Sequence, residues 1–176
     1  MESQTEIYSE LELIDKLVFK TCGFELKNIE IELESKEYFA HTFRLDDTNI
    51  KFRTAKITPT KTGQFVTIWK RKPKGITEPF HISDEIDFYI IATRKESNFG
   101  IFVFPKNVLY ENKILSDKNQ VGKRGIRVYP SWDLTTNKKA QKTQIWQTKY
   151  FIDISQDKQI ELEKVKKILD LSNKRN

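Results

Sequence analysis

The spacing of hydrophobic positions predicts helices towards both ends of the chain, with strands between them. In residues 5–20 the apolar side chains recur mostly three or four positions apart, which is typical of an amphipathic helix. These side chains are Ile7, Leu11, Ile14, Leu17 and Val18. We expect further helices at residues 106–110, 137–150 and 156–171.

Alternation of apolar and polar positions predicts strands in the middle of the chain. Three alternating segments are separated by turn-forming residues and suit an antiparallel meander. They cover residues 38–45, 49–57 and 64–70. The nearly unbroken apolar runs at 86–93 and 100–104 indicate a buried pair of strands, and a further strand is expected at 125–129. The charged run 25–36 is compatible with strand or helix.

This order of elements predicts an α+β fold with a mixed, largely antiparallel sheet flanked by helices. A length of 176 residues suits one domain. We divide it into an acidic helical region (1–37), a basic body (38–152) and a C-terminal helix (156–171). The sequence contains no apolar run long enough for a membrane span and no signal-peptide pattern, so we expect a cytoplasmic protein without membrane contact.

Charge is distributed unevenly along the chain. The net charge is +6, but residues 1–37 carry ten acids and four bases. Residues 48–77, which we call the acid-free stretch, contain eight Lys or Arg and no Asp or Glu. Strand alternation should place Lys51 and Arg53 on one face. A second basic cluster extends from Lys118 to Lys142 and contains one acid, Asp133.

Such concentrated positive charge predicts a polyanionic partner, and nucleic acid is the first candidate. We expect DNA rather than RNA. The candidate phosphate contacts are Arg53, Lys56, Lys61, Lys70, Arg71, Lys123, Arg124 and Arg127.

Aromatic residues could add a stacking platform for bases. We expect Trp69 and Trp146 to pack in the core, because large aromatics dominate core energetics. Trp132 follows a proline in a loop and is the better candidate for an exposed ring.

The predicted order of elements also resembles the core of the PD-(D/E)XK nuclease fold. Such enzymes need acidic ligands for a magnesium ion and a nearby lysine. Lys70 fits the lysine position, but the acid position falls on Ile68. Asp87 is the candidate metal ligand and Gln64 a weak substitute, and we expect Mg²⁺ only if the protein is a nuclease. The alternative for Asp87 is a strand-edge carboxylate with a basic partner.

Several motifs, in order, resemble the bacterial MepB-like family. They are FRTAKITPTKTGQFVTIWKR (52–71), PFHISDEIDFYIIATR (79–94), FGIFVFPKNVL (99–109), GKRGIRVYPSWD (122–133) and AQKTQIWQTKYF (140–151). The resemblance covers about residues 35–152. It implies a single-domain cytoplasmic protein with an endonuclease-like fold, similar to restriction enzymes, and it implies a fold rather than an activity.

The matching positions include Arg53, Lys56, Lys61, Lys70 and Arg127 but no carboxylate. We therefore expect a nucleic-acid-binding protein on a nuclease-like scaffold without a complete catalytic site. Two alternatives stay open: an active magnesium-dependent endonuclease, and a non-enzymatic regulatory module that binds an acidic protein surface.

Overall fold

Two central strands with both faces buried organise the fold. The computed structural model describes residues 9–170, and in it β8 (Phe88–Lys95) and β9 (Asn98–Pro105) run antiparallel. Along β8, Phe88 and Ile90 contribute to one hydrophobic core, whereas Tyr89 and Ile91 contribute to a second. An apolar run without polar interruption is what burial on both faces requires.

These two strands lie within a six-stranded sheet of order β1-β2-β3-β8-β9-β11. Only the contact between β3 and β8 is parallel. The four other strands are β1 (Leu26–Ile31), β2 (His41–Leu45), β3 (Thr48–Thr54) and β11 (Phe151–Asp153).

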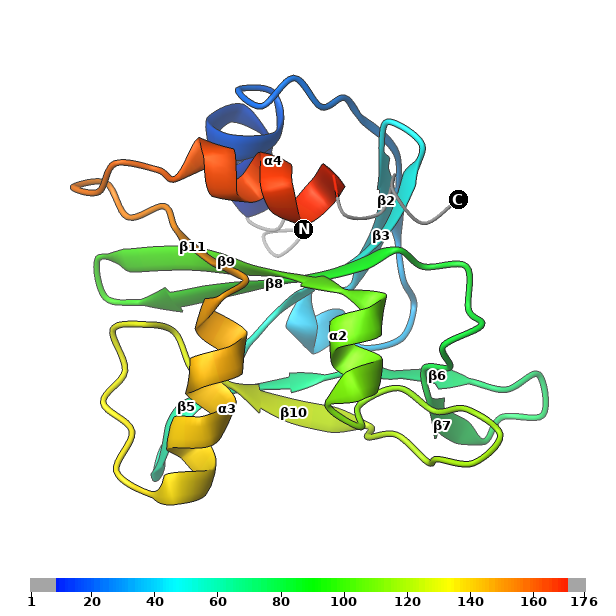
Figure 1. The fold of residues 1–176 in the computed structure, drawn as a ribbon. Helices are drawn as coiled ribbons and strands as arrows, with labels where there is room; N and C mark the ends of the chain where they lie inside the picture. The colour runs from blue at the N-terminus through cyan, green and yellow to red at the C-terminus, as the bar shows by residue number, and fades with distance from the viewer. Residues whose placement is uncertain (1–8, 171–176) are drawn as a thin grey trace.

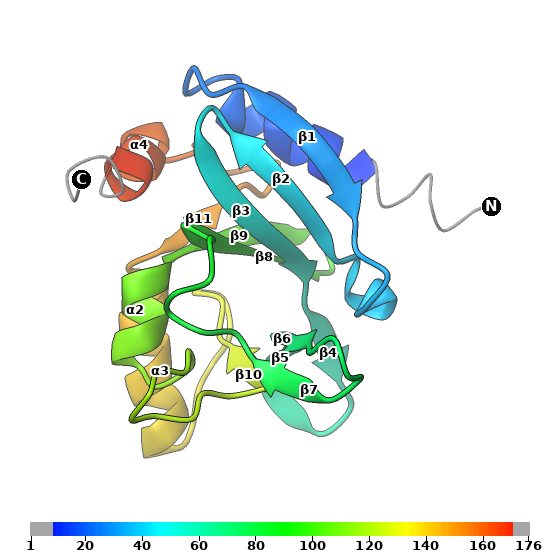
Figure 2. The ribbon, with the colours of Figure 1, turned by 90° about the vertical axis from the view of Figure 1, so that its right-hand side faces the viewer.

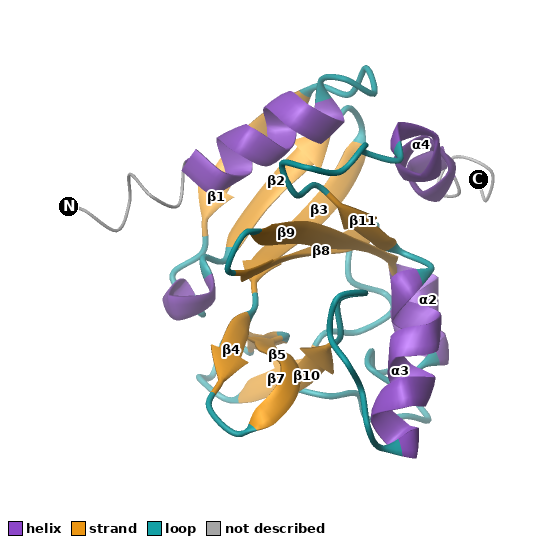
Figure 3. Ribbon diagram, turned by 90° about the vertical axis from the view of Figure 1, so that its left-hand side faces the viewer, coloured by secondary structure: helices purple, strands orange, loops and turns teal. Residues whose placement is uncertain are grey.

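Helices cover one face of this sheet and a second layer covers the other (Figures 1 and 3). The helix at residues 9–19 ends in the π-helical turn η1 (Asp15–Phe19) and packs with α4 (Leu162–Asp170) on the first core. No helix within residues 9–170 is long and apolar enough to cross a membrane.

The second layer contains a three-stranded sheet of order β10-β5-β4, a two-stranded hairpin and two helices. Its elements are β4 (Lys56–Thr58), β5 (Lys61–Thr67), β6 (Trp69–Arg71), β7 (Thr77–Pro79), α2 (Lys106–Glu111), β10 (Gly125–Val128) and α3 (Lys138–Thr148). The structure is therefore a mixed α+β domain with mostly antiparallel sheets and flanking helices, as expected.

The predicted three-stranded meander is wrong. The segments expected at 38–45 and 49–57 do form the β2–β3 hairpin, but the chain leaves the large sheet after Thr54. The open edge of β3 is occupied by β8, and Ala55 donates its backbone N–H to Ala92 on that strand. The next hairpin, β4–β5, therefore belongs to the second layer.

Other boundaries differ by a few residues. The pair expected at 86–93 and 100–104 is confirmed, and residues 26–31 of the ambiguous run form a strand. The C-terminal helix begins at Leu162 because a turn follows Ser155, and the predicted positions 5–8 and 171 lie outside the described residues. β7 and β11, three residues each, were not predicted.

A buried ion cluster joins the acidic and basic parts of the chain. The Glu32 carboxylate, just beyond β1, pairs with Lys51 and lies 2.6 Å from Arg53 Nη2. The side chains of Glu32 and Arg53 are 16% and 6% exposed. Thr42 on β2 also donates to Glu32, at 2.8 Å. The short 3₁₀ helix η2 (Lys36–Tyr38) follows and lies between β1 and the second layer (Figure 2).

Two opposing influences act on the pKa of Glu32. Burial is the larger single influence and disfavours the charged form. Arg53 and Lys51 together outweigh it, so the pKa of this carboxyl lies below its ordinary value. Burial also lowers the pKa of Arg53, an effect that Glu32 opposes.

The first prediction concerns Glu32→Gln, which leaves the Arg53 guanidinium buried without a counter-charge. We expect the free energy of unfolding at pH 7 to fall by about 3 kcal/mol, as for other broken buried pairs. Because the pKa of Glu32 is depressed on folding, its contribution is present above the unfolded pKa, about 4.3, and is lost as pH falls through the folded pKa. Urea unfolding at several pH values measures both effects.

The matched control is Glu30→Gln, which changes an exposed carboxylate two residues earlier that pairs with no described residue. This variant should stay within about 0.5 kcal/mol of the unmodified protein. Equal losses for both variants would contradict a structural role of the Glu32 cluster.

Candidate nucleic-acid interface

Ion pairs within the molecule neutralise much of the acid-free stretch. Lys70 Nζ lies 2.5 Å from Asp84 Oδ1 and 3.8 Å from Glu78. Lys72 lies 3.2 Å from the same Glu78 carboxylate. Lys70, expected at a nuclease site or on phosphate, therefore faces carboxylates in this structure.

An acidic segment covers further cations of the stretch. We call residues 32–38 the acidic strap. Its Glu34 lies 2.7 and 3.2 Å from two nitrogens of Arg71, and this two-nitrogen contact raises the pKa of Arg71. Lys56 Nζ lies 4.8 Å from the centre of the Tyr38 ring. Through Glu32, Glu34 and Tyr38, the acidic strap thus contacts four of the eight basic residues of the acid-free stretch.

Lys51 and Arg53 do lie on one face of β3, opposite Ile50 and Phe52, as alternation predicted. That face is not a free surface, because Glu32 covers it and Arg53 is only 5% exposed. Of the eight basic residues, Lys61 and Lys74 are those without a carboxylate or ring partner among residues 9–170.

Unpaired positive charge is concentrated in a cleft of about 850 Å³ in the second layer, which we call the basic cleft. The β4–β5 turn, β10 and α3 form its walls. The lining contains no carboxylate, and five basic side chains line it: Lys61, Lys123, Arg127, Lys139 and Lys142. None of the five pairs with a carboxylate in the described part of the chain. The cleft is therefore suited to hold an anion with several charged groups.

Two glutamines fix α3 against β10 and so shape this cleft. Gln147, 1% exposed, accepts from Tyr129 N at 2.8 Å and donates to Arg127 O at 2.9 Å. Gln144 donates to the backbone oxygens of Pro130 and Asp133, at 2.9 Å each. Hydrogen bonds from two side chains one helical turn apart thus attach the helix.

The N-terminal end of α3 adds a further attraction for anions. Asn137 caps it by accepting from Ala140 N at 2.8 Å. Its first turn contains no acid, although acids are favoured there, and Lys138, Lys139 and Lys142 lie on its first five positions. Positive side chains at the positive end of a helix dipole are unfavourable for the helix and favourable for an anion.

Arg127 on β10 points towards the β4–β5 turn. Its Nη2 donates to Thr58 Oγ1, whereas Nη1 is buried without a partner in the described structure. A buried donor without an acceptor is costly, so a bound oxyanion would relieve a cost already present. The predicted contact Arg124 instead donates to Thr77 and joins β10 to β7.

The prediction is confirmed for Trp146, which packs on the second core, and is wrong for Trp132. Trp146 packs on Phe104 at 5.4 Å and also lines the basic cleft. Trp132, expected to expose its ring, packs edge-on against Phe151 at 5.3 Å with its indole nitrogen buried. The preceding Pro130 indicated a loop but gave no sign of this inward packing.

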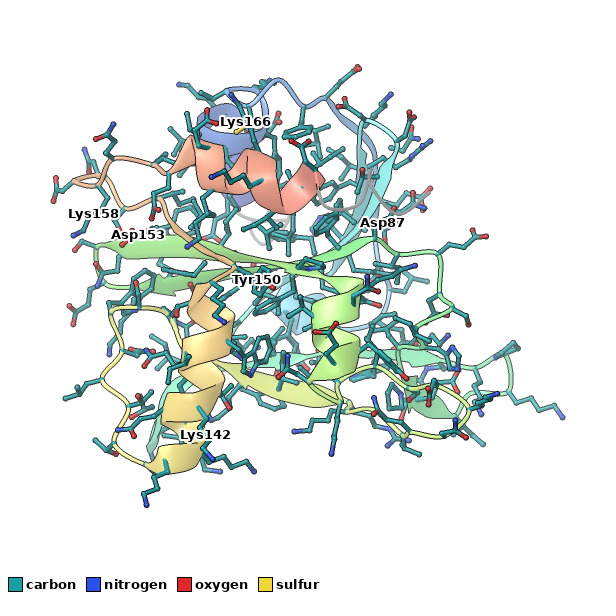
Figure 4. All side chains as sticks on the ribbon, in the orientation of Figure 1. Asp87, Lys142, Tyr150, Asp153, Lys158 and Lys166 are labelled. Atoms are coloured by element: carbon teal, nitrogen blue, oxygen red, sulfur yellow. The ribbon has the colours of Figure 1, made fainter. Side chains whose placement is uncertain are left out.

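The candidates for catalysis have hydrogen-bond or ion-pair partners within the fold. Asp87 accepts from Asn49 N at 2.8 Å, and Lys70 lies 2.5 Å from Asp84. Figure 4 shows Asp87 well separated from Lys142 in the basic cleft. Gln64, 1% exposed, donates to Arg94 O at 3.3 Å. Residues 9–170 contain no group of three or more His, Cys, Asp or Glu arranged to share a metal.

Of the eight predicted phosphate contacts, the basic cleft brings together Lys61, Lys123 and Arg127. It adds Lys139 and Lys142, which were visible as basic residues of the second cluster but not as neighbours of Lys61. Only the docking of α3 on β10 reveals that proximity. The other five, Arg53, Lys56, Lys70, Arg71 and Arg124, do not line the cleft and have the partners described above.

Comparison with known proteins agrees with the resemblance. The MepB-like family model matches residues 32–153. Among solved structures, the crystal structure of MepB is 33% identical in sequence with a TM-score of 0.74, and the match covers 86% of this chain and 98% of that chain. No curated protein matches the chain. The family match spans most of the sequence and the structural match most of both folds, so the chain belongs to the MepB-like family.

Proposed function

We propose that this protein binds nucleic acid and that the basic cleft holds the phosphate backbone. The observation that supports this most is that five basic side chains line one concave surface without any carboxylate in its lining. Several cations of the acid-free stretch, by contrast, are neutralised by nearby acids, as at Arg71 and Lys70. Cations left together at a cost to stability are expected where an external anion supplies the opposite charge.

The proposed interface differs from the set of phosphate contacts that the sequence predicted. Phosphate contacts come from Lys61, Lys123 and Arg127 on the strands and Lys139 and Lys142 on α3. Arg53 plays no part because it is buried beneath Glu32. DNA is the proposed partner, and the endonuclease-like scaffold and cytoplasmic location remain part of the same proposal.

Binding to labelled oligonucleotides at graded salt tests this function directly. With five phosphate contacts, log K should fall against log salt with a slope of about −3.5 for a single strand. Absence of binding at low salt would overturn the proposal. Tight binding to polyglutamate, but not to oligonucleotide, would favour an acidic protein partner instead.

The second prediction compares two lysines on helices. Lys142→Ala on α3 should weaken binding and reduce the magnitude of the salt slope by about one, because one phosphate contact is lost. Lys166→Ala on α4 is the matched control, since Lys166 lies on the opposite side of the large sheet (Figure 4) and pairs with Glu163 at 3.4 Å. The same loss in both variants would indicate a general charge effect and contradict a specific role for the cleft.

The third prediction concerns cleavage. Adding Mg²⁺ should leave the bound oligonucleotide intact, because the Asp87 carboxylate accepts a backbone N–H of β3 and Lys70 is paired with Asp84. Asp87→Ala should lower the melting temperature without changing the salt slope. Metal-dependent cleavage that disappears in Asp87→Ala would instead establish the nuclease alternative.

A further inference from the structure

A second hollow, of about 420 Å³, lies on the other side of the β4–β5 turn. Thr60, Lys61 and Thr62 on this turn line both the hollow and the basic cleft. The loop from β10 to α3 supplies the opposite wall (yellow in Figure 1). A chain whose phosphate lies at Lys61 therefore passes directly by the entrance of the hollow.

Two aliphatic side chains in the otherwise mostly polar lining of the hollow are unusually exposed. Leu134 is 82% exposed and Ile57 is 57% exposed, and both line it. Two large aliphatic side chains at one opening are suited to contact the faces of a flat, weakly polar group. A volume of 420 Å³ lies within the range of about 300–1,000 Å³ that is usual for small-molecule sites.

Gln64 supplies an unused polar group among the residues that line the hollow. It is 1% exposed, and its Nε2 donates to Arg94 O at 3.3 Å. Its Oε1 is buried without a hydrogen-bond partner in residues 9–170. An unpaired buried acceptor costs about 1–3 kcal/mol, and a ligand that presents an N–H group would remove that cost.

The remaining charge at this site does not repel a nucleic acid. Asp133 is the sole carboxylate of the lining, and its side chain is 4% exposed. Lys95 Nζ lies 3.3 Å from Asp133 Oδ1 and balances its charge. Lys61 then leaves the entrance positive.

We propose that this hollow, which we call the base pocket, receives one unpaired nucleobase of a strand whose phosphates lie in the basic cleft. The inference rests on the proposed function. Ile57 and Leu134 contact the base faces, and Gln64 Oε1 accepts from an N–H group on the base edge. An unpaired base is required because a base within a duplex has its face stacked and its pairing edge occupied.

The fourth prediction uses two single strands of equal length and charge, one with normal bases and one with several adjacent abasic sites. The normal strand should bind the unmodified protein roughly tenfold more tightly, as expected for one buried base, while both strands keep the same salt slope. Fluorescence anisotropy at one low salt concentration measures the ratio.

Leu134→Ala should reduce that ratio towards one, and it should not disturb folding because Leu134 is exposed. Leu33→Ala is the matched control: Leu33 is also 82% exposed, but it lies on the acidic strap, outside the base pocket. Gln64→Ala should reduce the ratio too, with circular dichroism as the check on its folding. Lys142→Ala should weaken both strands equally and leave the ratio unchanged.

The outcomes separate the two proposals. Equal affinity for the normal and abasic strands overturns the base pocket and leaves phosphate binding intact. An unchanged ratio in Leu134→Ala places any base contact elsewhere and also overturns it. If neither strand binds at low salt, the proposed function fails, and the base pocket fails with it.

Discussion

The contact of one carboxylate, Glu32, with two cations on β3 is the constraint on which the arrangement of charge depends. β3 lies inside the large sheet, so its polar face cannot reach solvent freely. A guanidinium that is 6% exposed is tolerated there only with a counter-charge close by. The chain therefore needs an acidic segment over its basic strand, and the strap from residue 32 to 38 meets that need. The acidic N-terminal region is thus a structural complement of the basic body.

A segment with many basic residues in the sequence therefore does not necessarily form a positive surface in the folded protein. The acid-free stretch contains eight basic residues and no acid, yet acids from other segments neutralise most of it. The surface that stays positive is assembled from three separate segments: the β4–β5 turn, β10 with the loop before it, and α3. Acids are absent from its lining, so this surface attracts anions more strongly than a face on which both signs of charge alternate.

Periodicity predicted the core well because burial on both faces of a sheet leaves an unmistakable apolar run, as at Ile90 and Ile91. The β2–β3 hairpin was predicted from a different pattern, the alternation of apolar and polar positions. β11 was not predicted, since three residues are too few to show a period. The site was harder to predict. Lys61 and Lys142 are brought together by the hydrogen bonds of Gln144 and Gln147, and polar docking of this kind has no hydrophobic signature.

The manner in which α3 is attached also explains why the basic cleft stays open. An apolar helix face would be buried by broad contact with the second core. Gln147 instead attaches the helix through two hydrogen bonds, one to Arg127 O on β10 and one to Tyr129 N just after it, with Trp146 as an aromatic contact to the core. The space beside β5 stays open, and Lys139 and Lys142 line it with Lys61. A few satisfied buried hydrogen bonds thus hold the helix in place without closing the surface that it helps to form.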